Sequence, residues 1–224
     1  MKPVAVPEVI PIFPLVHTVL LPGELMPLHI FERRYRDMVR DALASHRIIG
    51  MVQIEGEEGE PESLESMKRP PIRGVGCAGI IARHHELTGG RYLIWLLGVQ
   101  EFRVAEELQT LTRYRQVRID PLSTEGRGSE SSVESLRFDL LAALPLFLEG
   151  PAEKVVTVIR ELAKGEDDQL IVVAAMALRL GPEAKQALLE ARSIPERFRL
   201  LKGSLEERLK RRPASLRLDP ALLN

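Results

Sequence analysis

Nucleophiles and phosphate-binding loops would carry enzymatic chemistry, and this sequence offers one weak candidate of each kind. Cys77 is the sole cysteine, which excludes an internal disulfide and a cysteine-based zinc site. Its neighbours are small and apolar, and because such surroundings raise a thiol pKa, we expect a buried, inert side chain. The glycines at 74, 76 and 79 fit GxGxxG, but they lie in a predicted strand rather than at a strand-to-helix turn. The sequence contains neither a P-loop motif nor a GxSxG elbow, so it indicates no catalytic site and no cofactor.

Histidines and carboxylates could instead bind a metal, but their spacing is unfavourable. His84, His85 and Glu86 are adjacent, and neighbouring residues of a strand point to opposite faces. His29 and Glu32 straddle a predicted strand-to-helix junction. Neither arrangement has the HExxH spacing of a zinc site, so we predict exposed or hydrogen-bonded histidines rather than metal ligands.

Charge and composition argue against several kinds of partner. The formal net charge of the chain is −1, which gives no field to attract nucleic acid or an anionic membrane. Aromatic residues make up 4%, too few for a platform that stacks several bases. No apolar run approaches the roughly 20 residues that span a bilayer, and early prolines interrupt any signal-peptide core. We therefore expect a cytoplasmic protein with no membrane partner and no nucleic-acid partner.

Short strands around one helix are predicted for the first half of the chain. Apolar, often alternating runs indicate strands at 10–16, 25–30, 48–54, 74–81, 92–97 and 116–120. Prolines in the first two strands fit either edge strands or strands that enter a barrel, and an acidic loop is predicted at 55–65. An apolar stripe from Phe31 to Leu43 predicts an amphipathic helix whose charged face includes an Arg33–Asp37 ion pair. This pattern is typical of a small, partly closed β-barrel.

Helical periodicity replaces strand periodicity in the second half. We predict a β-rich domain at 1–122, a polar linker at 123–132, a helical bundle at 133–211 and an extended tail at 212–224. The segment 170–180 is apolar nearly all round, which places it in the middle of the bundle. The predicted fold class is therefore α+β.

Three segments in a fixed order carry a family resemblance. They are PIFPLVHTVLLPG with LMPLHIFERRYRDM at 11–38, the pattern GxxxFRV at 98–104, and KQALLEARSIPERFRLL at 185–201. With them the chain resembles the N-terminal, substrate-binding domain of the ATP-dependent protease Lon over residues 10–209. The resemblance implies a PUA-like β-barrel followed by an α-helical bundle. It also implies binding of unfolded or degradation-marked polypeptides, and self-association into a homo-oligomer.

The same resemblance shapes the expected role. The chain stops before any ATPase or protease domain of Lon, so we expect a stand-alone, non-catalytic module of the kind found in bacteria. Such a module would act as an adaptor or regulator in protein quality control, with a separate ATP-dependent protease as one partner.

A peptide-binding surface is predicted on the second strand and the helix after it. Its residues are the apolar Met26, Leu28, Phe31 and Tyr35, with Arg33 and Arg36 at the rim. An extended peptide could also add to an edge strand such as 10–15 through main-chain hydrogen bonds. The alternative, which the helical periodicity favours, places these apolar residues in the core, together with Trp95.

Two other functions stay open at this point. RNA binding would need one basic face made by six arginines, namely Arg73, Arg83, Arg91, Arg113, Arg115 and Arg118. A small-molecule sensor would need an apolar pocket with converging polar groups between the barrel and the bundle.

Overall fold

Two compact units make up the chain in this computed structural model, which describes residues 4–55, 69–123 and 130–211. We call Met1–Ser123 the sheet unit and Thr124–Asn224 the helical unit. The predicted α+β class is confirmed. Most of the predicted linker and the predicted tail lie outside the described residues, and helix α3 begins at Glu130, inside that linker.

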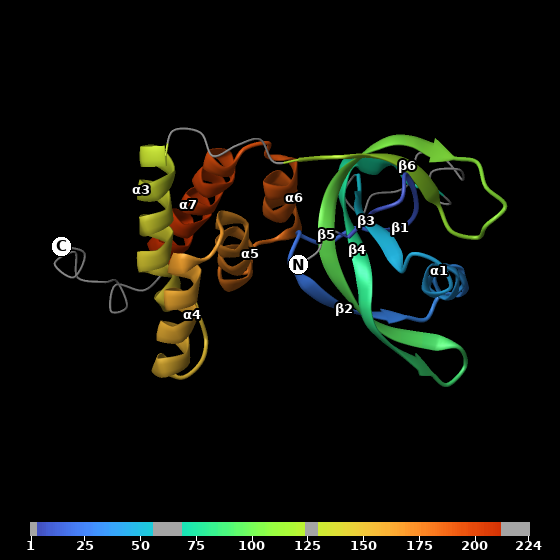
Figure 1. Cartoon of the computed structure of the whole chain (residues 1–224), viewed down its shortest axis with the longest axis horizontal. Coiled ribbons are helices and arrows are strands. Elements are labelled where there is room, and N and C mark those ends of the chain that lie inside the picture. The colour runs from blue at the N-terminus through green and yellow to red at the C-terminus, as the bar shows by residue number, and fades with distance from the viewer. Residues whose placement is uncertain (1–3, 56–68, 124–129, 212–224) are drawn as a thin grey trace. The chain divides into compact units, whose positions relative to one another are not determined.

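One helix and six strands are described in the sheet unit. They are β1 (Val9–Leu15), β2 (Leu25–Ile30), α1 (Arg33–Leu43), β3 (Ile48–Ile54), β4 (Ile72–Leu87), β5 (Arg91–Leu108) and β6 (Gln116–Pro121). The strand order is β2-β5-β4-β3-β1-β6, and β6 pairs again with the second half of β5. Five strands thus pair in a ring, whereas β2 continues the sheet outward from the first half of β5 (Figure 1). The sequence predicts a partly closed barrel, and the observed six-stranded sheet is not a clean barrel.

The strands β4 and β5 are much longer than predicted. They have 16 and 18 residues and form one curved hairpin through a turn at 88–90 (Figure 1). Register shifts, one of them between Ala78 and Gly79, bend the pair. A Cβ added at Gly79 would lie 2.5 Å from Leu96 Cγ. The prediction that glycines of this strand mark bulges and close approach is confirmed.

β1 lies between β3 and β6, which corrects the predicted edge position of 10–15. It pairs with β6 over Val9–Pro11 and with β3 over Ile12–Leu15. Because the two neighbours overlap different halves of the strand, the missing N–H groups of Pro11 and Pro14 interrupt neither ladder. The prolines that suggested an edge are accommodated by this staggered pairing.

The interior of the sheet unit is an aliphatic cluster with one phenylalanine. Its buried members are Ile10, Ile12, Ile48, Val52, Ala78, Phe102, Val117 and Ile119. Transferring such side chains out of water supplies the main driving force for folding.

Helix α1 packs against β1, β3 and β5 with one buried stripe. The stripe is Tyr35, Met38, Val39 and Ala42. It confirms the predicted helical periodicity except at the start, because Phe31 precedes α1 and is exposed. The charged face of α1 is the predicted ion-pair surface, but Asp37 pairs with Arg40 and Arg113 rather than with Arg33.

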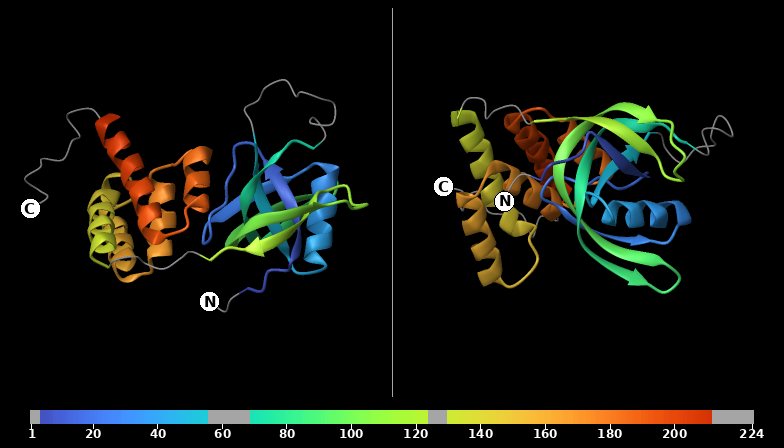
Figure 2. Two further views of the ribbon diagram at one scale, coloured as in Figure 1. Left: turned by 90° about the horizontal axis from the view of Figure 1, so that it is seen from above. Right: turned by 45° about the vertical axis from the view of Figure 1, so that its right-hand side comes forward.

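Five α-helices and one short 3-10 helix are described in the helical unit. They are α3 (Glu130–Ala143), η1 (Leu144–Leu146), α4 (Ala152–Lys164), α5 (Asp167–Ala177), α6 (Pro182–Glu190) and α7 (Ile194–Arg211). α7 contacts α3, α5 and α6, and both views of Figure 2 show α3 and α7 side by side. Most of α5 is buried, as predicted for 170–180, although Met176 is exposed. None of the described helices combines the length and the apolar composition needed to cross a membrane.

Candidate functional site

The free edge of the sheet is β2, which among the described residues has β5 as its one hydrogen-bonded neighbour. The Gly98 N–H donates to the Glu24 carbonyl over 2.9 Å, so even-numbered residues of this segment direct their backbone groups toward β5. Odd-numbered residues of β2 therefore direct theirs to the open side. Leu25 and His29 offer an N–H and a C=O there, whereas Pro27 offers a C=O alone. A strand tolerates proline at such a position because no ladder bond is lost.

The side chains of the same odd-numbered residues share one face with apolar residues of β5. The cross-strand pairs are Leu25 with Leu97, Pro27 with Trp95, and His29 with Leu93. Residues directly opposite each other point to the same face. The His85 ring of β4 lies 6.4 Å from the Trp95 ring, and the Phe31 ring lies 5.9 Å from the His29 ring. We call this surface the edge face: Leu25, Pro27, His29, Phe31, His85, Leu93, Trp95 and Leu97.

The edge face is partly open to solvent. Leu25 and Phe31 are 50% and 61% exposed, and the three β5 side chains are half-buried. Free backbone groups beside exposed apolar side chains are the two features that an extended apolar peptide uses when it adds to a sheet. Backbone direction and side-chain direction alternate together along a strand, so such a peptide would place every second side chain beside the edge face.

The alternation of β2 divides the predicted peptide-binding residues. Phe31 belongs to the edge face, but Met26 and Leu28 point to the opposite face, where their β5 partners are fully buried. Tyr35 is 5% exposed and packs in the core with its ring 4.3 Å from that of Phe13. The structure therefore does not bring the four apolar candidates together, because strand and helix periods turn them to different sides.

The two rim arginines also separate. Arg33 is exposed on α1. Arg36 is half-buried, and its Nη1 donates to the Gly89 carbonyl over 2.5 Å. This bond ties α1 to the turn between β4 and β5, so Arg36 has a structural contact in place of the predicted rim position.

Trp95 is half-buried on the edge face, although the sequence predicts it in the core. The run YLIWLL at 92–97 is apolar throughout, so it shows no alternation that would identify its exposed side. The sequence of β2 contains a pattern that could have identified the edge face. Its proline and histidine are two residues apart, and both occupy exposed positions in the structure.

The six arginines of the RNA-binding alternative do not form a free basic face. Arg113 pairs with Asp37, Arg115 with Glu107, and Arg118 with Glu8 and Glu106. The hydrogen bond from Arg113 holds the pKa of the Asp37 carboxyl below its usual value. Of the remaining three, Arg73 and Arg83 lie on β4, and Arg91 at the start of β5 donates to the Thr88 carbonyl.

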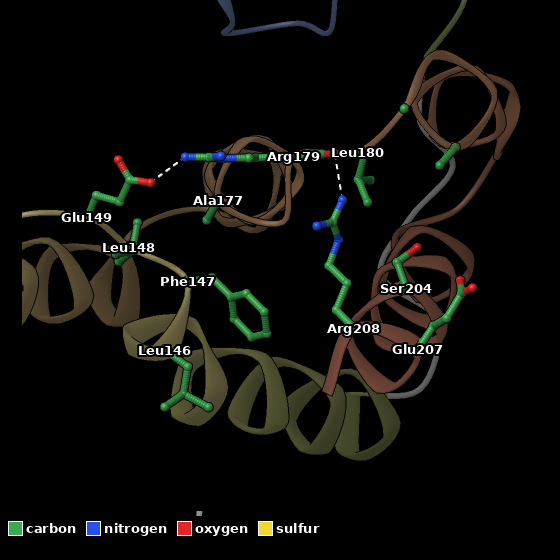
Figure 3. A pocket seen from close by; sticks show the side chains of 12 residues that line it. Leu146, Phe147, Leu148, Glu149, Ala177, Arg179, Leu180, Ser204, Glu207 and Arg208 are labelled. Atoms are coloured by element: carbon green, nitrogen blue, oxygen red, sulfur yellow. Dashed lines mark hydrogen bonds and ion pairs between the residues drawn. The ribbon is translucent and has the colours of Figure 1, made fainter. Parts of the chain in front are cut away.

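A pocket of about 650 Å³ lies within the helical unit (Figure 3). All of its lining residues come from 146–208, so it is not the pocket between barrel and bundle that the small-ligand alternative predicts. The Phe147 ring points into it, and the Arg208 Nη2 donates to the Arg179 carbonyl over 2.7 Å. Arg179 also forms an ion pair with Glu149 on its exposed side. Charged groups that already pair with one another leave few polar atoms to orient a ligand.

Reactive chemistry has little support in the described part of the chain. Cys77 is fully buried, and burial raises the pKa of its thiol far above the usual value, which confirms the predicted inert side chain. Among residues 4–55, 69–123 and 130–211, no three His, Cys, Asp or Glu side chains gather where a metal ion could bind.

The relatives and solved structures named below are Lon proteases or Lon N-terminal domains. A family model described as the ATP-dependent protease La (LON) substrate-binding domain matches residues 9–207. Lon protease 2 of Myxococcus xanthus is 25% identical over 97% of this chain, and Lon protease of Syntrophus aciditrophicus is 28% identical over 86%. The chain spans about a quarter of the length of these curated relatives, 26% and 24% respectively.

Two solved structures share the fold. The N-terminal domain of a Mycobacterium avium complex Lon protease superimposes with a TM-score of 0.68 at 16% identity, covering 89% of this chain and 98% of its own. A Lon N-terminal domain protein from Xanthomonas campestris gives 0.58 at 23% identity, covering 92% and 99%. With the family model matching most of its length, the chain belongs to the Lon substrate-binding domain family.

Proposed function

We propose that this protein binds extended, apolar segments of unfolded or degradation-marked polypeptides by adding them as a strand to β2. The observation that carries the proposal is the coincidence, on one strand, of free backbone groups and the edge face. Family membership supports it, because the family is described as a substrate-binding domain. Leu25 and His29 would bond the peptide backbone, and Trp95 and Phe31 would contact its apolar side chains.

The wider role is a non-catalytic adaptor or regulator in cytoplasmic, bacterial protein quality control. In this role the module holds a polypeptide for a separate ATP-dependent protease, and a homo-oligomer would present several β2 edges at once. The sheet unit would serve as a PUA-like domain and the helical unit as a bundle that accompanies it. The named relatives, which are Lon proteases, motivate this assignment.

Fluorescence anisotropy with a labelled unfolded polypeptide tests the proposal at physiological salt. Leu25→Asp places a charge on the edge face and should weaken binding about tenfold, as loss of an apolar anchor does at other interfaces. Leu111→Asp is the matched control, because Leu111 is fully exposed in the loop between β5 and β6. Equal affinity of Leu25→Asp and the unmodified protein would refute the edge face as the binding surface.

Backbone pairing has its own test. Two versions of one apolar peptide carry N-methyl groups on alternate residues, one version on the odd set and the other on the even set. An added strand directs one set of amides toward β2, so one version should lose binding and the other should keep it. Equal binding of both would contradict strand addition. A labelled single-stranded RNA is measured in parallel, and saturable binding to RNA alone would overturn the proposed function.

A further inference from the structure

Four arginines line a small cavity of the sheet unit, and none of the residues that line it belongs to the edge face. The cavity is lined by Pro14, Arg34, Tyr35, Arg69, Arg113, Tyr114 and Arg115 and has a volume of about 60 Å³. The arginines come from α1, from the segment before β4 and from the loop before β6. A cavity of this size is far below the ~300 to 1,000 Å³ of drug-sized ligand sites. It suits a single small group.

Among residues 4–55, 69–123 and 130–211, the ion pairs around the cavity leave the guanidinium groups in excess. Glu107 accepts two hydrogen bonds from Arg115, at 2.8 and 2.6 Å, and lies 3.7 Å from Arg69. Asp37 pairs with Arg113 at 3.0 Å, and Glu32 pairs with Arg34 at 2.9 Å. Three carboxylates thus serve the four guanidinium groups of the wall. Arg40 also pairs with Asp37, but Asp41 beside it balances that charge. Within the part of the chain that the structure describes, the wall thus has one guanidinium group more than the carboxylates paired with it.

Tyr35 brings an uncommitted hydroxyl to the same wall. Its side chain is nineteen-twentieths buried, held by the Phe13 ring and by the Arg34 guanidinium, which lies 4.5 Å from the ring centroid. Among the described residues no hydrogen bond reaches the Tyr35 hydroxyl, whereas Tyr114 donates to Asp41 over 2.9 Å. Burial raises the pKa of Tyr35, so at neutral pH the hydroxyl is protonated and able to donate. Because Tyr35 lines the cavity, its hydroxyl can donate to a water or a ligand there.

We propose that this cavity binds one small oxoanion, a phosphate or a carboxylate group. Arginine supplies planar pairs of N–H donors that match both groups, and several guanidinium groups together with a hydroxyl would surround the oxygens. The pairing of Arg115 with Glu107 and of Arg113 with Asp37 holds the guanidinium planes in place before the anion arrives. The cavity shares no lining residue with the edge face, and the proposal does not rest on strand addition at β2.

Isothermal titration calorimetry with inorganic phosphate and, separately, with acetate tests the proposal at low ionic strength. We expect saturable binding of at least one of the two, weakened about tenfold by Arg113→Gln, which removes a charge-assisted donor set. Tyr35→Phe keeps the ring and its packing, so a loss of affinity there reports the hydroxyl alone. Tyr92→Phe and Arg103→Gln are matched controls outside the cavity. Thermal unfolding confirms that each variant is folded.

The outcomes separate cleanly. Binding of phosphate alone would assign a tetrahedral oxoanion as the ligand, and binding of acetate alone would assign a carboxylate. Either result supports the cavity as the site if Arg113→Gln and Tyr35→Phe weaken binding and the two control variants do not. Absence of saturable binding to either anion at millimolar concentration would overturn the proposal. Equal weakening by Arg103→Gln and Arg113→Gln would also overturn it, since that result is nonspecific screening by net charge.

Discussion

Replacing Arg137 by methionine should destabilise the helical unit and leave the sheet unit unchanged. Arg137 of α3 is 16% exposed at its side chain and donates to Asp167 Oδ1, at the start of α5, over 2.5 Å. Its Nη2 also donates to the carbonyls of Leu162 and Gly165, at 2.5 and 2.7 Å, where α4 ends. One guanidinium therefore joins three helices, and it satisfies carbonyls that a helix C-terminus leaves without intrahelical partners.

The magnitude follows from the burial of both partners. Asp167 is 7% exposed at its side chain, and removing one member of a buried ion pair costs about 3–5 kcal/mol because the other charge stays buried. A loss of ~3 kcal/mol lowers the melting temperature of a domain of this size by roughly 10–20 °C. Arg179→Met is the matched control, because the Arg179–Glu149 pair is 73% and 82% exposed and such pairs contribute about 0–1 kcal/mol.

Two spectroscopic probes resolve the units in the intact chain. Circular dichroism at the helical band follows mainly the helical unit, while fluorescence follows Trp95, the sole tryptophan, in the sheet unit. In Arg137→Met the helical signal should melt earlier and the Trp95 signal should not move. Adding Asp167→Asn should recover part of the loss, since it removes the buried charge. The reasoning is refuted if Arg137→Met costs no more than Arg179→Met, or if both probes shift equally.

Two further predictions concern the sheet unit. Gly98→Ala should destabilise by about 1–3 kcal/mol in urea unfolding, because the new Cβ would lie 2.2 Å from the Leu21 carbonyl oxygen, whereas Gly74→Ala, with no atom within 4 Å, should change little. Burial and then the hydrogen bond to Asp41 raise the pKa of Tyr114 to about 12, so the folded state keeps a proton that the unfolded state releases above about pH 10. Stability should fall as pH rises from 10 toward 12, by at most ~2 kcal/mol from this group, and Tyr114→Phe should flatten that slope.

Local periodicity predicted the elements whose two sides differ in character. The stripe of α1 follows the 3.6-residue period closely, so sequence alone placed its core residues. Helix α5 was predicted from a different pattern, because a segment that is apolar nearly all round indicates burial on most sides. The lengths of β4 and β5 could not be predicted in the same way. The outer half of β4 contains Arg83, His84 and His85, which are exposed and, among the described residues, pair with β5 alone.

The position of the candidate site could not be predicted from the sequence, because it depends on which strand forms the edge of the sheet. β1 and β2 are both short, apolar and interrupted by proline, so the sequence allows an edge position for both. Only the pairing distinguishes them, and that pairing is fixed by β3, β5 and β6, which are far away in the chain. An edge is a property of topology. Proline within a strand therefore does not identify an edge strand. An edge strand tolerates proline, but a central strand also does when its two neighbours pair with different halves of it.

Because β2 is an edge strand, each of its odd-numbered residues has two roles. Backbone groups and side chains alternate with the same period, so Leu25, Pro27 and His29 serve the open edge and the edge face together. Pro27 removes one donor from this edge, which weakens pairing with an identical strand and leaves Leu25 and His29 as the positions where an added strand can form both bonds. The strand thus limits uncontrolled edge-to-edge association while keeping two pairing positions beside Trp95. A site that binds many unfolded sequences needs this combination, because main-chain bonds are independent of sequence and apolar contact is nearly so.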